Sequence, residues 1–275
     1  MSYDPFLRFC LSLRDENVLA ETLVVAAHPD DEVIGAGGQL PKLEGIHILH
    51  VTDGAPRNMA DASANGFSKR EDYAAVRRRE LQAALDHCGI PSSRLLQLGF
   101  ADQEASFRLV DLTVRLAETI RELNPDLVLC HAYEGGHPDH DATSFAAHAA
   151  LTLLRREGRR DPLLMEFALY HASPDGMAAL RFLPAENCPW ILLPLSAGER
   201  SLKQRMIGCF KTQRKVLMQF PLSVEAFRLA PRYNFTRPPH PELLYYEKFD
   251  WGVNGSTWRA MAAEALTQLA LSGSI

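Results

Sequence analysis

The chain alternates between short apolar runs that are typical of strands and longer segments with helical periodicity. Residues 23–27 (LVVAA) form a continuous apolar run after a charged stretch, which predicts a strand buried on both faces. Further short apolar or alternating runs predict strands at residues 46–52, 95–98, 126–131, 166–171 and 190–193. Most of these strands are separated by a segment long enough to hold a helix.

The intervening segments repeat apolar residues at the spacing of an amphipathic helix. Residues 109–123 carry five apolar residues three or four positions apart, and Asn124-Pro125 ends the pattern. The same reasoning predicts helices at about residues 71–89, 141–155, 197–218 and 256–271. Strands and helices in alternation predict an α/β fold: a Rossmann-like, mostly parallel sheet flanked by helices.

The length of 275 residues suits one elaborated domain of this class. We expect a single domain over residues 1–275, with its core at about 22–220. Residues 221–275 are rich in proline and aromatic residues. This segment is expected to form a lid over a site or a contact between subunits of a homo-oligomer.

Composition excludes several classes of protein. The chain is 47% hydrophobic and 23% charged, which is the composition of a globular protein. Its net charge of -5 argues against nucleic-acid binding. The N-terminus lacks the pattern of a signal peptide, and no window holds the roughly 18 apolar residues of a membrane span. The five cysteines contain no CxxC pair, so free thiols are expected. The sequence therefore predicts a soluble cytoplasmic protein with no membrane partner.

Ionisable residues directly follow two of the predicted strands. Residues 27–32 (AHPDDE) follow the first apolar run, and residues 137–141 (HPDHD) follow the strand at 126–131 across a glycine-bearing loop. Ligands bind at the carboxyl ends of strands in open α/β sheets. Because unpaired carboxylates are costly to bury, these segments indicate a site that holds something positive.

The residue types in these two segments suit a catalytic metal. Imidazole nitrogen and carboxylate oxygen are zinc ligands, and a catalytic zinc site uses about three of them and leaves one position for water. A remaining carboxylate can then take the proton of that water. The sequence therefore predicts the parts of a hydrolytic site.

Structural roles compete with this interpretation. Either segment by itself could be a turn whose aspartate caps the next helix, but their joint occurrence after two strands favours a site. His131 and His171 end apolar strands, which favours a hydrogen-bonded packing role. Arg77, Arg78 and Arg79 are expected to be mostly a solvated helix face, with at most one of them in the site.

The two motifs together resemble the PIG-L or LmbE-like deacetylase family. AHPDDE at 27–32 and GGHPDHDA at 135–142 both match without a gap, and the resemblance covers about residues 22–155. It implies that His28, Asp31 and His140 bind zinc and that Asp30 is the general base. One Zn²⁺ per chain is implied, and other divalent metals suit the same ligands.

The resemblance also implies supporting residues. His137, oriented by Asp139, would stabilise the oxyanion or protonate the leaving amine. Arg77 resembles a family arginine near the sugar hydroxyls, and Tyr133 or a C-terminal tyrosine is a candidate to assist the oxyanion. Glu32 is expected to support the metal ligands without binding the metal.

The function that the resemblance implies is a zinc-dependent hydrolase. It would remove an N-acetyl group from an amino sugar or glycoconjugate with metal-activated water. The alternative is a zinc-dependent hydratase of an unsaturated dicarboxylic or keto acid on the same fold and site. That substrate needs cations around the metal, for which Arg57, Lys69 and Arg70 are candidates, whereas a sugar favours hydroxyl partners and an aromatic platform. A non-catalytic binding protein is disfavoured because every motif position is filled.

Overall fold

A seven-stranded sheet forms the centre of the computed structural model, which describes residue 9 and residues 21–43, 45–185 and 188–275. The order within these residues is β3-β2-β1-β4-β5-β9-β8, and a separate hairpin pairs β6 with β7. The first five strands of this order are parallel, β9 pairs antiparallel with β5, and β8 pairs antiparallel with β9. The strand bounds are β1 Thr22–Ala26, β2 His47–Pro56, β3 Leu95–Asp102, β4 Leu127–His131, β5 Leu163–Phe167, β6 Tyr170–Ser173, β7 Gly176–Ala179, β8 Trp190–Pro194 and β9 Val224–Leu229.

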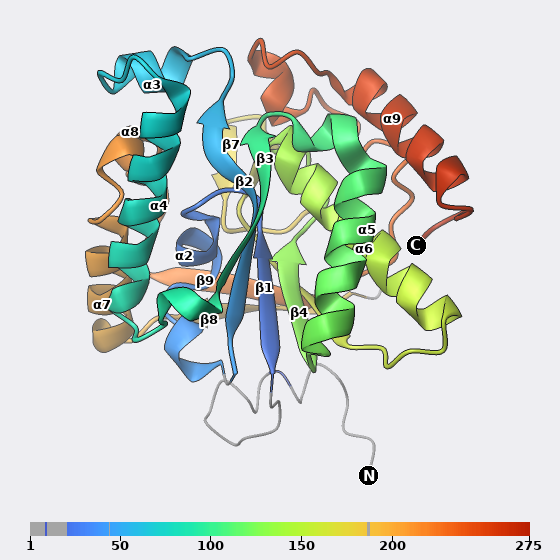
Figure 1. The fold of residues 1–275 in the computed structure, drawn as a ribbon, viewed down its shortest axis with the longest axis horizontal. Helices are drawn as coiled ribbons and strands as arrows, with labels where there is room; N and C mark the ends of the chain where they lie inside the picture. The colour runs from blue at the N-terminus through green and yellow to red at the C-terminus, as the bar shows by residue number, and fades with distance from the viewer. Residues whose placement is uncertain (1–8, 10–20, 44, 186–187) are drawn as a thin grey trace.

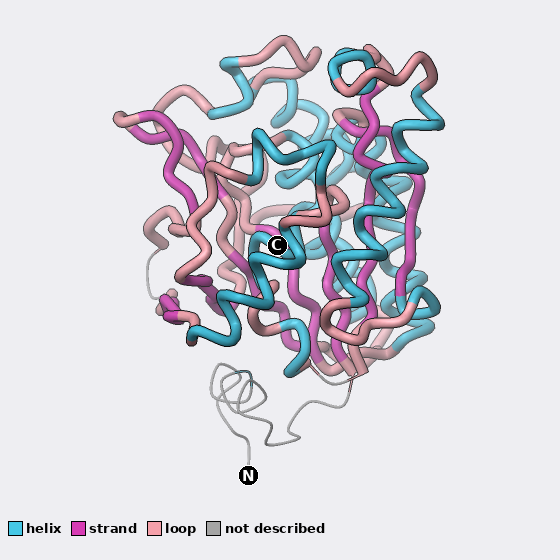
Figure 2. The backbone as a smooth tube through the Cα atoms, turned by 90° about the vertical axis from the view of Figure 1, so that its left-hand side faces the viewer, coloured by secondary structure: helices cyan, strands magenta, loops and turns pink. Residues whose placement is uncertain are grey.

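Helices cover both faces of the sheet. Figure 1 shows α4, α7 and α8 on one side and α5, α6 and α9 on the other, and the side view in Figure 2 shows helices overlying the strands. Each side has its own apolar core against the central strands. The helix bounds are α2 Asp31–Ala36, α3 Ala60–Ala64, α4 Arg70–Asp86, α5 Leu109–Leu123, α6 Pro138–Arg156, α7 Ala197–Ile207, α8 Arg214–Leu217 and α9 Gly255–Gln268.

The fold class predicted from the sequence is confirmed, and several element boundaries are corrected. The predicted strand 166–171 spans the end of β5 and the start of β6. The predicted helix 197–218 is divided, because α7 ends at Ile207 and α8 begins only at Arg214. Strand β9 was not predicted, and it lies inside the central sheet although it belongs to the segment after residue 220. The division of the chain into core and C-terminal segment stays a prediction.

Two other sequence predictions concern cysteines and membranes. The four cysteines in the described part of the chain are free, whereas Cys10 lies outside it. Most of the N-terminal segment that bears on a signal peptide also lies outside the described residues. Among the residues that are described, none of the helices has the length and apolar character needed to cross a membrane.

The strand order places a switch point between β1 and β4. The chain runs from β1 outward through β2 and β3, and then returns to add β4 on the other side of β1. Connections that leave β1 and β4 in opposite directions open a crevice at the carboxyl ends of these strands. The two ionisable motifs are the segments that leave β1 and β4, so the fold brings them to the same crevice.

A buried ion pair fixes α2, the short helix that starts at the first motif. The ammonium of Lys203 on α7 donates to the carbonyl oxygen of Ile34 at 2.7 Å and to Oε1 of Glu225 at 2.8 Å. The same Oε1 accepts a hydrogen bond from the backbone N–H of Gly38. Lys203 and Glu225 are fully buried, so this pair joins α2, α7 and β9 in the interior.

Replacing Lys203 by Met should lower the free energy of unfolding by about 3–5 kcal/mol, because it leaves the buried carboxylate of Glu225 without its cation. Lys42→Met is the matched control, since the Lys42–Glu199 pair is partly exposed and should contribute at most about 1 kcal/mol. Urea unfolding of both variants measures the difference. Equal costs for the two substitutions would show that the buried pair does not stabilise the fold.

Candidate metal centre and active site

The loop after β1 supplies the first group of site residues. His28 and Asp31 approach each other with Nδ1 and Oδ2 at 3.2 Å, and Asp31 also accepts the backbone N–H of His28. Asp30 lies between them with a φ of 149°, a backbone conformation that residues with a side chain rarely adopt. Such a conformation costs about 1–3 kcal/mol and persists where the surroundings impose it, commonly at functional sites.

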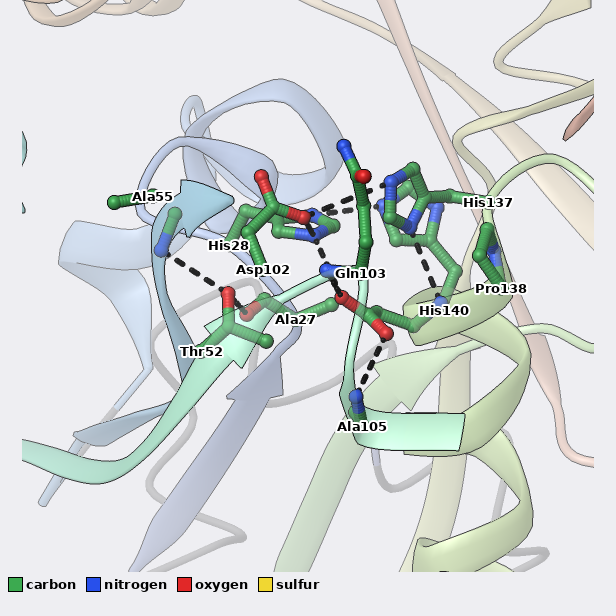
Figure 3. Close-up of polar contacts among 12 residues, drawn as sticks. Ala27, His28, Thr52, Ala55, Asp102, Gln103, Ala105, His137, Pro138 and His140 are labelled. Carbon is green, nitrogen blue, oxygen red and sulfur yellow. Dashed lines mark hydrogen bonds and ion pairs between the residues drawn. The ribbon is translucent and has the colours of Figure 1, made fainter. Parts of the chain in front are cut away.

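The start of α6 supplies the second group. His137 is the N-cap and Pro138 the first residue of this helix, which positions His140 one turn further along. The loop before the helix passes close to β6, because a Cβ at Gly136 would lie 2.1 Å from the carbonyl oxygen of Tyr170. A glycine at this position therefore lets the His137–His140 turn reach the crevice. Figure 3 shows His28, Asp102, His137 and His140 gathered there.

The predicted ligands His28, Asp31 and His140 form a compact set of donor atoms. Nδ1 of His28 lies 3.3 Å from Nε2 of His140, and this Nε2 lies 3.4 Å from Oδ1 of Asp31. All three residues are buried. Tetrahedral coordination with bonds of about 2.0–2.1 Å separates neighbouring ligand atoms by about 3.3 Å. The donor types suit a divalent cation and each of these distances is close to that value, with His28 facing Oδ2 of Asp31 and His140 facing Oδ1. Among the described residues, three other buried groups also bring donor atoms within 4.8 Å of one another: His28–His137–His140, His28–Asp102–His137–Asp139 and Asp31–His131–His140.

Two other histidines beside this set each accept a backbone N–H group with a ring nitrogen. Nε2 of His131 accepts the backbone N–H of Ala27 at 2.9 Å, and burial lowers the pKa of His131 to about 3. Nδ1 of His137 accepts the backbone N–H of Asp139 at 3.1 Å, which leaves the proton of a neutral ring on Nε2. The packing role predicted for His131 is confirmed, and neither acceptor nitrogen is free to bind a metal.

Asp30 is held by Arg77, the one member of the arginine run 77–79 that is buried. The guanidinium donates to Oδ2 of Asp30 at 3.1 Å and to the carbonyl oxygens of Pro29 and Gly54. Burial raises the pKa of Asp30 to about 8, and Arg77 acts against this rise. A carboxyl group in this range can take up and release a proton near neutral pH.

His137 is placed to donate a proton or a hydrogen bond from Nε2. Its imidazole packs against the Trp251 ring at 4.5 Å between centroids, and both residues line the cavity. Burial and the neighbouring His28 lower the pKa of His137 well below its ordinary value. The ring is therefore a neutral donor.

Asp139 orients His137 in a way that differs from the prediction. Its backbone N–H, and not its carboxylate, contacts the ring of His137. The carboxylate accepts the backbone N–H groups of Gln103 at 2.6 Å and Ala105 at 3.0 Å, and Oδ2 lies 3.4 Å from Nε2 of His28. Asp139 therefore ties the loop after β3 to the site and faces His28 from the side opposite Asp31 and His140.

Asp102 belongs to the site and was missed in the sequence. It is the last residue of β3, and its Oδ1 lies 3.0 Å from Nε2 of His28, although the two atoms lack the alignment of a hydrogen bond. The same oxygen is 3.8 Å from Nε2 of His137. The predicted strand ended at residue 98. Had it been continued to Asp102, this carboxylate would have been placed at the carboxyl end of a third strand, next to the crevice.

Comparison with known proteins identifies the family. The family profile "PIG-L: GlcNAc-PI de-N-acetylase" matches residues 23–151. A Bacillus anthracis protein called "Probable N-acetyl-alpha-D-glucosaminyl L-malate deacetylase 2" is 32% identical over 183 residues, covering 64% of this chain and 78% of that protein. The chain belongs to the PIG-L family. A Bacillus cereus protein of the same name is 33% identical over 141 residues, and the match spans 50% of this chain and 63% of that relative's length.

Solved structures share the PIG-L fold. A zinc-inhibited form of the teicoplanin deacetylase Orf2 superposes with a TM-score of 0.56 at 17% identity, covering 76% of this chain and 97% of that one. The N,N'-diacetylchitobiose deacetylase from Pyrococcus horikoshii gives a TM-score of 0.56 at 19% identity, with 84% and 94% covered. These similarities support the architecture described above.

Glu32 and Tyr133 are the remaining residues of this PIG-L chain for which the sequence predicted a supporting role. Oε2 of Glu32 is 2.9 Å from Nε2 of His50 and accepts the backbone N–H of Asp30, so Glu32 holds the loop after β1. Its support of metal ligands stays a prediction. Tyr133 does not line the metal cavity. Its hydroxyl donates to the carbonyl oxygen of Arg237, and its ring stacks on Trp258. The structure thus places Arg77 in the site and Tyr133 outside it.

Nδ1 of His137 already accepts a hydrogen bond, whereas His140 is a predicted metal ligand, so the two histidines should differ in their effect on metal binding. His140→Ala should weaken Zn²⁺ affinity by more than the roughly 10–100-fold that loss of a supporting contact costs, whereas His137→Ala should stay within that range. Calorimetric titration of the metal-free variants measures both affinities, with the exposed His87→Ala as the control. The reverse order, with His137→Ala the weaker binder, would move the metal to the Asp102 side of His28.

Proposed function

We propose that this protein is a zinc-dependent N-deacetylase that removes an acetyl group from an amino sugar or glycoconjugate. The observation that supports it most is the buried donor set of His28, Asp31 and His140, flanked by Asp30 and His137 on the same cavity. The names of the relatives, which describe deacetylases of N-acetylglucosaminyl compounds, point in the same direction.

The reaction divides between a base and a hydrogen-bond donor. A bound divalent cation would supply Lewis acidity for the water and the amide carbonyl. Asp30 accepts the proton of the attacking water, while Arg77 keeps its carboxylate in position. Nε2–H of His137 donates to the carbonyl oxygen as negative charge develops there. The C–N bond then breaks, the nitrogen takes the proton held by Asp30, and acetate and a free amine leave.

The cations around the site favour this reaction over hydration of a dicarboxylic acid. Arg57 is paired with Glu104 and Arg70 with Asp53, and neither lines the cavity. Lys69 is also outside its lining. Among the described residues that line the cavity, Arg77 is the side chain with a permanent positive charge, and it is already engaged by Asp30. A substrate with two carboxylates would find no free cationic side chain among these lining residues.

Asp30→Asn tests the assigned chemistry. The variant should keep its bound metal and lose about 10²–10⁴ in turnover, because the amide cannot accept the proton of water. Acetate and amine released from an N-acetylglucosamine conjugate are the readouts, with metal content measured in parallel. The matched control is Asp86→Asn, an exposed substitution at the end of α4. Near-normal turnover in metal-loaded Asp30→Asn would remove Asp30 from the reaction.

A further inference from the structure

A turn at the end of β3 holds one residue in an unfavourable backbone conformation. The backbone N–H of Glu104 donates to the carbonyl oxygen of Ala101 at 3.2 Å, so Gln103 is the third residue of this turn. The φ of Gln103 is 69°. Turns that need a positive φ at their third position usually have glycine or asparagine there, because a longer side chain is disfavoured in that conformation. The chain has glutamine at this position although glycine would remove the strain.

Hydrogen bonds to Asp139 hold this turn in place. The backbone N–H of Gln103 donates to Oδ2 of Asp139 at 2.6 Å, and the N–H of Ala105 donates to Oδ1 at 3.0 Å. Asp139 is fully buried and directly precedes His140, a predicted metal ligand. The turn is therefore kept at a fixed place relative to the candidate metal centre. Strain that the surroundings maintain in this way is common at functional sites.

The side chain of Gln103 is available to a substrate. Gln103 lines the cavity at the candidate metal centre together with Asp102 and His137, and the volume of this cavity is about 210 Å³. Figure 3 shows the carboxamide of Gln103 on the same side as the carboxylate of Asp102. Within the described part of the chain, the hydrogen bonds of Gln103 involve its backbone alone. One acceptor oxygen and two N–H donors are thus free at the cavity wall.

The chemistry of this carboxamide suits a sugar hydroxyl. On the proposed function, the N-acyl carbonyl faces the metal ligands and Nε2–H of His137, so the sugar ring lies against the rest of the cavity wall. A hydroxyl both donates and accepts hydrogen bonds, and a carboxamide matches it in both respects. Because the carboxamide is uncharged, this contact does not depend on the charge of a bound divalent cation.

We propose that the carboxamide of Gln103 binds a hydroxyl group of the N-acylated sugar and so helps to select the substrate. This inference rests on the proposed function. It explains why a long polar side chain stands in a conformation that favours glycine. Removing the side chain should then lower activity without lowering the stability of the fold. A glutamine that serves the fold alone would show the opposite pattern.

Two substitutions test the role of the carboxamide. Gln103→Met keeps the length of the side chain and removes its hydrogen-bonding groups, whereas Gln103→Gly removes the side chain and the strain. Both should lower kcat/KM for the methyl glycoside of N-acetylglucosamine about 2- to 10-fold, the range expected for one neutral hydrogen bond. Zinc affinity should not change. In thermal unfolding, Gln103→Gly should be at least as stable as the wild type, because relief of the positive φ offsets the greater freedom of the unfolded chain.

Ala270→Gly is the matched control. Ala270 also has a positive φ, of 52°, and it directly follows the C-cap of α9, outside the cavity lining. This variant should likewise keep its stability, and it should keep the wild-type kcat/KM. If Gln103→Gly is destabilised while Ala270→Gly is not, the side chain of Gln103 serves the fold and the inference is overturned.

Substrate analogues show whether the contact is made with a hydroxyl. Three analogues of the methyl glycoside each lack one of its free hydroxyl groups. Gln103→Met should have a smaller effect on kcat/KM for at least one of them than for the parent glycoside, because that analogue lacks the contacted hydroxyl. An equal effect on all four compounds, or an effect on none, would overturn the inference while the deacetylase stands.

Binding separates the inference from the proposed function. If no compound releases acetate, the proposed function fails, and calorimetry with the zinc-loaded wild type and Gln103→Met then decides the inference. Weaker binding of the parent glycoside to the variant, with at least one analogue bound equally by both proteins, supports the contact. Equal binding of the parent glycoside to both proteins, or the same loss for all four compounds, overturns it.

Discussion

The burial of many ionisable groups at one point is the constraint on which this structure depends. The crevice between the ends of β1 and β4 holds imidazoles and carboxylates that are each less than a tenth exposed: His28, Asp30, Asp31, Asp102, His131, His137, Asp139 and His140. Carboxylates this close cannot all be ionised in a poorly solvated space without positive charge or hydrogen-bond donors. The surrounding elements supply such donors, among them the guanidinium of Arg77 and the backbone N–H groups of Gln103 and Ala105. On the proposed function, a bound divalent cation supplies further positive charge.

The carboxylates of Asp139, Asp30 and Asp31 have different partners in the site. The carboxylate of Asp139 accepts two backbone N–H groups and so positions the loop after β3. Asp30 has a positive φ, accepts a hydrogen bond from Arg77 and lines the cavity. Asp31 faces both His28 and His140. On the proposed function, the same environment gives neighbouring aspartates three roles: a structural carboxylate, a base and a metal ligand.

The sequence predicted the parts of this account that depend on local pattern. Helix α5 was predicted at its observed bounds, because its apolar residues keep a strict helical spacing. The motif residues were predicted to meet because parallel strands align their carboxyl ends. Long-range relations were not accessible: β9 pairs antiparallel with β5, and Asp102 reaches His28 only because β3 extends beyond its apolar run. The role of the Asp139 backbone N–H likewise depends on the geometry of a helix cap that residue types do not specify.

The position of the metal tests the central claim most directly. Anomalous X-ray scattering at the zinc edge from a crystal of the zinc-loaded protein locates the ion without reference to activity. The account predicts one ion within about 2.0–2.2 Å of Nδ1 of His28, Nε2 of His140 and a carboxylate oxygen of Asp31. Asp30 and His137 should be unbonded to it. An ion bound instead between Nε2 of His28 and the carboxylates of Asp102 and Asp139 would contradict this account.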